Sequence, residues 1–156
     1  MPATKLTEYL DSQDVKYATI EHDAAVYTAQ EIAASTHIPG KQLAKTVMVK
    51  IDGDLAMAVL PASQRVNFDR LKELVGASKV ELASEKEFRS NFPDCQVGAM
   101  PPFGNLYDIP VYAARELAGE IEIAFCAGSH TELVRMGFAD FKRLAEPKIL
   151  DFAWTS

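Results

Sequence analysis

Three short stretches of the chain carry residue types that could do chemistry. Lys45 opens the apolar run "KTVMV", residues 98–104 read "GAMPPFG", and residues 126–130 read "CAGSH". A lysine at the start of a strand is either a solvated edge charge or a cation held in place for a phosphate or a carboxylate. Lys41 and Lys50 are close to Lys45 in the sequence, so the three could form a local positive patch.

The second stretch combines two glycines with two adjacent prolines. Gly98 and Gly104 permit backbone conformations that other residues avoid, and they let a ligand approach the main chain. Pro101 and Pro102 stiffen the loop and lack N–H donors. From the residues alone, this segment is either a structural loop or a rigid rim that contacts a ligand through backbone groups.

The third stretch allows a cysteine–histidine pair, but the pair lacks a third group to orient it. Cys126 ends an apolar run and is more typical of a small buried filler. His130 follows Gly128 and Ser129 at an expected strand–loop junction, where it is either a ligand-facing residue or a surface histidine. The three histidines are scattered without zinc-type spacing, and phosphate-loop and dinucleotide motifs are absent, so we expect neither a metal nor a cofactor.

Composition narrows the class of protein. The 156 residues are 48% hydrophobic and carry a formal charge of -6, which fits one globular domain over residues 1–156. An acidic chain is a poor sequence-independent binder of DNA or RNA, although a small basic patch could still hold a few nucleotides. The sequence shows no signal peptide, no membrane-length apolar run and no paired cysteine spacing, so we expect a cytoplasmic protein without a membrane partner.

The elements that must position these residues alternate between helices and strands. Helices are predicted over 5–13, 28–36, 67–76, 84–92 and 138–145, and strands over 17–22, 44–51, 54–62, 79–83, 109–114 and 120–126. Asp52-Gly53 predicts a tight hairpin, and Gly119 a turn between the last two strands. Residues 131–136 could be a strand or the start of the following helix, and the tail is expected to pack down. The sum is a mixed α/β domain with a largely antiparallel sheet.

Taken together, the order "EH…TAQEIA…AKTVMVK", "GAMPPFG" and "AGSH" resembles the YbaK/ProX family over about residues 5–147. This domain occurs alone and as the editing insertion of bacterial prolyl-tRNA synthetases. The resemblance implies an α/β (mixed) fold, a single domain with a curved, mostly antiparallel sheet surrounded by helices. It also implies two catalytic residues, Lys45 and His130, and a substrate-binding set of Gly98, Pro102, Phe103, Gly104, Gly128 and Ser129.

The family resemblance further implies an activity and a partner. The expected activity is trans-editing, in which the ester of a mischarged tRNA carrying a small amino acid (Ala, Cys, Ser or Thr) is hydrolysed. Lys45 would hold the phosphate of the terminal adenosine, and the loop would frame the aminoacyl group. A binding pocket distinguishes similar side chains by only about 1–3 kcal/mol, so a second, size-selective site that hydrolyses the wrong product is expected. The alternative is a non-catalytic module that binds a tRNA 3′ end, a nucleotide or an aminoacyl-tRNA synthetase.

Overall fold

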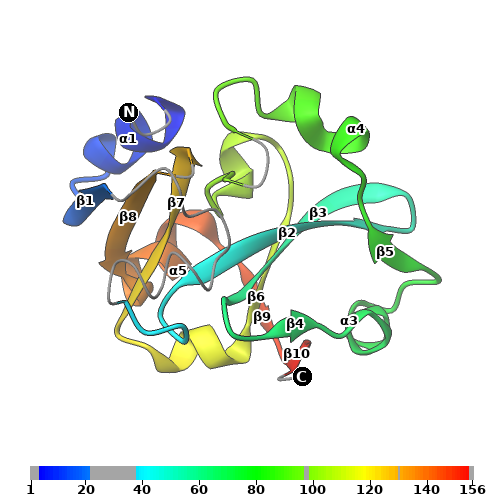
Figure 1. The fold of residues 1–156 in the computed structure, drawn as a ribbon. Coiled ribbons are helices and arrows are strands. Elements are labelled where there is room, and N and C mark those ends of the chain that lie inside the picture. Colours follow the sequence, from blue (N-terminus) through cyan, green and yellow to red (C-terminus); the bar gives the residue numbers. More distant parts are fainter. Residues whose placement is uncertain (1–3, 22–37, 97–98, 130, 155–156) are drawn as a thin grey trace.

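The computed structural model describes residues 4–21, 38–96, 99–129 and 131–154. Within these ranges the chain forms four α-helices and ten strands, which confirms the mixed α/β class (Figure 1). The helix predicted over 28–36 lies outside the described residues. The strands divide into a five-stranded, a three-stranded and a two-stranded sheet rather than one continuous sheet.

The five-stranded sheet has the order β5-β2-β3-β6-β9. Its centre is the predicted hairpin of β2 (Ala44–Ile51) and β3 (Asp54–Pro61), which places Lys45 opposite Leu60. Asp52 and Gly53 both have positive φ, 50° and 89°, as a tight hairpin turn of this kind requires. β5 (Val80–Leu82) is antiparallel to β2, whereas β6 (Val111–Ala114) and β9 (Lys148–Leu150) add in parallel.

The three-stranded sheet is antiparallel, with β8 (Glu132–Gly137) between β1 (Tyr17–Glu21) and β7 (Glu122–Ser129). It is joined to the larger sheet where Leu43, just before β2, bridges to Ala124 in β7. The segment 131–136 is therefore a strand from Glu132 onward rather than the start of a helix. The strands on either side of Gly119 are not neighbours, because a 3-10 helix, η3 (Arg115–Gly119), carries the chain from one sheet to the other.

The helices begin and end at the expected signals. The Asn67 side chain accepts a hydrogen bond from the Arg70 amide at 3.0 Å, and Gly76 ends α3 (Phe68–Val75) with φ 69°. The Ser84 amide donates to Glu87 Oε1 at 2.8 Å at the start of α4 (Glu85–Phe88). The rest of that predicted helix is a 3-10 turn, η1 (Arg89–Asn91).

The remaining helices and the tail pack against these sheets (Figure 1). α1 (Thr4–Ser12) buries Leu6 and Leu10, and α5 (Phe138–Ala145) buries Phe141. In the tail, β10 (Ala153–Trp154) pairs with the short strand β4 (Arg65–Val66), and Phe152 is fully buried. The expectation that the tail packs down is confirmed. None of the described helices has the length and apolar character that crossing a membrane requires.

The β2–β3 hairpin separates two apolar clusters. On one face Met48, Met57 and Val59 join a large aromatic core that includes Phe103 and Phe125. On the other face alternate hairpin residues, such as Val49, Ala58 and Leu60, pack with Leu71 of α3 and Phe152 of the tail. Because side chains alternate along a strand, Lys45 lies on this second face. The two faces thus place the loop residues and Lys45 on opposite sides of the hairpin.

Candidate functional site

The predicted loop packs inward. Gly98 lies outside the described residues, but residues 99–104, including Pro102, are all buried. The Phe103 side chain is 0% exposed, and its ring centroid lies 5.7 Å from that of Phe125 and 5.5 Å from that of Phe141. The structure therefore gives Phe103 a packing role, and a contact between Phe103 and a substrate stays a prediction.

Gly104 is required by the close approach of two backbone segments. A Cβ atom at this position would lie 2.1 Å from the Ile109 carbonyl oxygen and 2.8 Å from Val111 Cγ2. The Gly104 carbonyl in turn accepts hydrogen bonds from the amides of Tyr107 and Ile109, at 2.9 and 2.8 Å. η2 (Gly104–Leu106) and the segment after it are held tightly by this turn. The glycine at the end of "GAMPPFG" thus has a structural reason to be there.

A polar cluster fixes the chain on both sides of the loop. The Tyr107 hydroxyl donates to Asp94 Oδ1 at 3.1 Å and lies 3.5 Å from Cys95 Sγ. The Lys5 ammonium from α1 lies 5.0 Å from the centroid of the Tyr107 ring, a cation–π distance. Burial raises the pKa of Cys95 to about 11, so this thiol stays protonated at neutral pH. These contacts tie the residues before the loop to those after it.

Two backbone hydrogen bonds bring the loop and the "AGSH" stretch together. The Gln96 amide donates to the Gly128 carbonyl at 2.7 Å, and the Gly128 amide donates to the Ala99 carbonyl at 2.8 Å. Gly128 adopts φ 99°, a conformation that side chains disfavour, at an irregularity in the β7–β8 pairing. Segments far apart in the sequence, both expected at the site, therefore lie side by side.

The chain beyond Gly128 contains a buried acid that the sequence reasoning missed. Ser129 Oγ donates to Glu132 Oε1 at 3.3 Å and lies 3.2 Å from Thr131 Oγ1. Glu132 is only 5% exposed and is the one buried charged side chain among the described residues. Its position at the start of β8 gave no local signal of burial. His130, between these residues, lies outside the described part of the chain.

The Lys45 side chain, on β2, has neighbours that differ from those of the loop and Gly128. Its ammonium donates to the Ala62 carbonyl at 3.4 Å. Ala62 belongs to a small cluster with Leu43 and Ala124, which links the start of β2 to β7. Burial, and secondly the charge of Arg65, lower the pKa of Lys45. Within the described residues, Lys45 forms no hydrogen bond or ion pair with the loop or with Gly128.

Lys50 does not belong to the local positive patch that the sequence allows for Lys41, Lys45 and Lys50. Lys50 lies at the far end of β2, where its ammonium pairs with Glu81 at 3.0 Å and also with Glu87. Those carboxylates neutralise it, because both lie in segments that fold back against β2. The cation whose field does reach Lys45 is Arg65, from β4. No local pattern could reveal Arg65, since its place depends on how the chain returns after β3.

Cys126 is not set up as a nucleophile. Burial raises the pKa of its thiol to about 11, so the reactive thiolate is a very small fraction at neutral pH. Its side chain packs against the cluster of Ile38, Leu43, Ala62, Ala124 and Leu133. This agrees with the interpretation of Cys126 as a small filler. In the described ranges, no three His, Cys, Asp or Glu side chains gather as a metal site would require.

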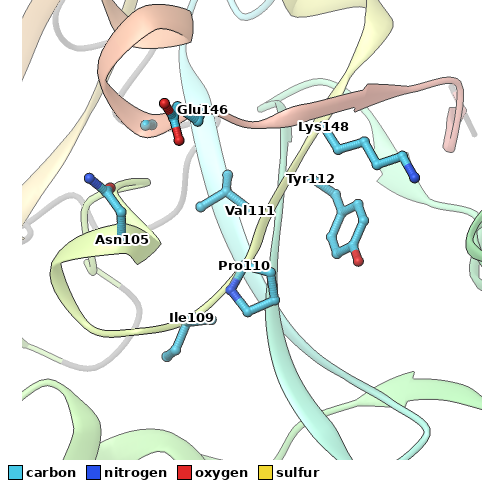
Figure 2. Close-up of a pocket in the computed structure, with 8 residues that line it drawn as sticks. Asn105, Ile109, Pro110, Val111, Tyr112, Glu146 and Lys148 are labelled. Carbon is cyan, nitrogen blue, oxygen red and sulfur yellow. The ribbon is translucent and has the colours of Figure 1, made fainter.

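A separate cavity of about 300 Å³ contains none of the predicted site residues (Figure 2). Asn105 and Glu146 lie on one side of β6 in this view, and Tyr112 and Lys148 on the other. The Asn105 amide donates to the Leu144 carbonyl at 3.2 Å, and Glu146 ends α5 with φ 49°. The Asn105 side chain thus stabilises the end of a helix, and we assign the cavity no catalytic role.

Known proteins match this chain in sequence. The family described as the aminoacyl-tRNA editing domain matches residues 23–144. The proline–tRNA ligase of Bacillus cytotoxicus is 33% identical over 103 residues, which are 66% of this chain and 18% of the ligase. The corresponding enzyme of Bacillus mycoides is 30% identical over the same length. The match therefore spans less than a fifth of the length of these ligases.

Solved structures match the fold across almost the whole chain. A crystal structure described as that of a candidate trans-editing enzyme for prolyl tRNA synthetase has a TM-score of 0.84 at 21% identity, covering 97% of this chain and 96% of that one. A hypothetical protein of known structure has a TM-score of 0.85 at 21% identity, covering 96% and 99%. At such identities the structural similarity establishes the fold alone, whereas the sequence match over residues 23–144 establishes the family. The chain belongs to the aminoacyl-tRNA editing domain family, as its resemblance to YbaK/ProX proteins predicted.

Proposed function

We propose that this protein is a trans-acting deacylase that hydrolyses the ester of a tRNA mischarged with a small amino acid. The observation that carries the proposal is the pair of backbone hydrogen bonds between Gly128 and residues 96 and 99. These bonds hold together two motifs that the family resemblance assigns to the substrate. Membership of the editing-domain family supports an aminoacyl-tRNA as the ligand.

The proposed reaction is the attack of water on the ester carbonyl carbon. The bond from that carbon to the ribose oxygen breaks, the oxygen takes up a proton, and free amino acid and tRNA are released. Cys126 and Cys95 are protonated thiols at neutral pH, so neither supplies a thiolate. We infer that the terminal ribose hydroxyl of the substrate assists the attack, while the protein positions the ester. Lys45 would hold the phosphate of the terminal adenosine.

Rigid walls would then decide which amino acid is accepted. Pro101 and Pro102 are buried, and the chain around them is fixed by Gly104 and Tyr107. A wall that cannot move excludes a larger side chain by overlap, which a flexible loop would not do. The structurally similar protein described as a candidate trans-editing enzyme for prolyl tRNA synthetase favours tRNA(Pro) as the tRNA that carries the wrong amino acid. The synthetase itself is a further candidate partner.

A panel of aminoacyl esters tests this proposal. Purified protein is added to tRNA(Pro) charged with Ala, Cys, Ser, Thr or Pro, and the loss of ester is compared with the spontaneous rate. We expect acceleration for at least one of the small residues, and no change when a chelator is present. Binding without acceleration of any ester would favour the non-catalytic module. Loss of activity in chelator, restored by zinc, would contradict the metal-free chemistry.

A further inference from the structure

The Lys45 side chain lines a cleft on the face of the β2–β3 hairpin that is opposite to the aromatic core. This Lys45–Trp154 cleft has a volume of about 380 Å³. It is formed by β2, β4, β5, β10 and the start of α3, and it is lined by Lys45, Val47, Arg65, Val66, Phe68, Leu82 and Trp154. Its size is that of an ordinary small-ligand pocket, about 300 Å³ or more.

Large apolar side chains are exposed to solvent in this cleft. Three large apolar side chains are exposed in the described residues, and two of them, Leu82 at 65% and Trp154 at 52%, line this cleft. Trp154 is held by its strand, where it lies opposite Arg65 in the β10–β4 pair. An exposed tryptophan on a paired strand, beside a cation, indicates a contact surface rather than a loose end.

The charge of the cleft is positive although the chain is acidic. Lys45 and Arg65 both line it, and none of its seven lining residues is acidic. Burial, and secondly the like charge of Arg65, lower the pKa of Lys45. In the described part of the chain, no carboxylate forms an ion pair with either cation. An anionic group bound here would relieve their repulsion.

We propose that the Lys45–Trp154 cleft binds the unpaired nucleotides that precede the terminal adenosine of the substrate tRNA. A base would stack on Trp154, and Arg65 would hold a phosphate. Single-stranded nucleic acid is recognised by this combination, aromatic faces for bases beside cations for the backbone. The inference rests on the proposed function, in which Lys45 holds the phosphate of the terminal adenosine. Because Lys45 also lines the cleft, the preceding nucleotides would lie in the cleft.

Trp154 provides a direct signal, since it is the one tryptophan of the chain. The whole protein is titrated with the single-stranded RNA 5′-ACCA-3′, and with a blunt RNA hairpin that has no unpaired end. We expect saturable quenching of tryptophan fluorescence by the first probe and not by the second. Neither probe carries an amino acid, so binding is measured independently of ester hydrolysis. A failure of the proposed activity would therefore be distinguishable from a failure of this site.

Variants locate the binding. By anisotropy of labelled ACCA, Trp154→Ala should bind at least about five-fold more weakly, and Trp154→Phe should retain most of the affinity. Arg65→Ala should also weaken binding and reduce the salt slope by about 0.7. Arg143→Ala removes the same charge from an exposed residue outside the cleft and should leave affinity unchanged.

Three outcomes would overturn the proposal. The first is the absence of ACCA binding, as expected if a protein surface occupies the cleft instead. The second is binding without any change in tryptophan fluorescence and with equal affinity for the Arg65→Ala and Arg143→Ala variants. The third is equal quenching by the blunt hairpin, which would indicate general attraction to phosphate. Melting curves of each variant identify any loss of fold.

Discussion

The two faces of the β2–β3 hairpin differ in how their residues are held. On the aromatic face, residues 99–104 are buried, and Phe103 contacts the rings of Phe125 and Phe141. On the other face, Lys45 and Trp154 line an open cleft. The first face fixes a shape, whereas the second offers charge and an aromatic surface. The buried motif residues therefore serve the fold on one face, whereas on the other face Lys45 is free of core packing and is the residue that we propose meets the ligand.

This difference has energetic consequences. Truncation of a fully buried phenylalanine such as Phe103 typically costs about 3–5 kcal/mol. Among the described residues Lys45 makes one hydrogen bond, of 3.4 Å, and it faces the charge of Arg65, so its removal should take little from the stability of the folded state. Substitutions on the aromatic face should thus reduce stability first. Substitutions in the cleft should reduce function while the protein stays folded.

Among the substitutions proposed for measurement, Gly104→Ala should have the largest effect on the fold. The new methyl group would meet the Ile109 carbonyl, and overpacking of this kind costs about 1–3 kcal/mol, occasionally more. Gly119→Ala is the matched control, because a Cβ atom there meets nothing within 4 Å. Urea unfolding should separate the two variants clearly. Equal unfolding free energies would show that the loop is less rigid than its contacts indicate.

A smaller effect is expected from Lys50→Met, and it should depend on pH. Hydrogen bonds, first from Lys50 and then from Ser84, lower the pKa of Glu87 from 4.5 to about 2. A depressed carboxyl pKa stabilises the fold above pH 4.5, and this contribution is lost as the pH falls toward 2. The variant should therefore unfold at lower urea than the wild type at pH 7, with the gap closing near pH 2.5. A gap independent of pH would contradict the ion pair.

The smallest effect on hydrolysis is expected from Cys126→Ala. Because burial raises the pKa of this thiol to about 11, the reaction at pH 7 should proceed at the wild-type rate. Cys95→Ala, at the other free cysteine, provides the comparison. The measurement is single-turnover ester loss for both variants. A fall to the spontaneous rate in Cys126→Ala alone would make Cys126 a nucleophile after all.

Local signals in the sequence predicted most elements correctly. Asp52-Gly53 predicted the hairpin, and Asn67 with Gly76 predicted α3, because each depends on backbone conformations set by a few adjacent residues. Such local signals could not predict how the strands are arranged in sheets. The turn at Gly119 separates two sheets, and nothing within that segment distinguishes this from a hairpin.

The candidate site was harder to predict for the same reason. The loop reads as a rim, but the aromatic partners that bury Phe103 come from β7 and α5. Lys50 is close to Lys45 in the sequence, yet Glu81 and Glu87 neutralise it. Arg65 and Trp154 become neighbours only through a strand pair that spans much of the chain. Residue types were therefore recognisable from the sequence, whereas their partners depended on the fold.

The most direct test of the difference between the two faces is the Lys45→Ala variant, measured for ester hydrolysis and thermal unfolding in the same buffer. We expect a melting temperature close to that of the wild type and a rate about 100-fold lower, since a misplacement of about 1 Å can have that effect. His130→Ala should lose less activity, because water could replace a positioning hydrogen bond. A Lys45→Ala protein that melts normally and hydrolyses at the wild-type rate would make Lys45 a solvated edge charge and contradict the proposed site.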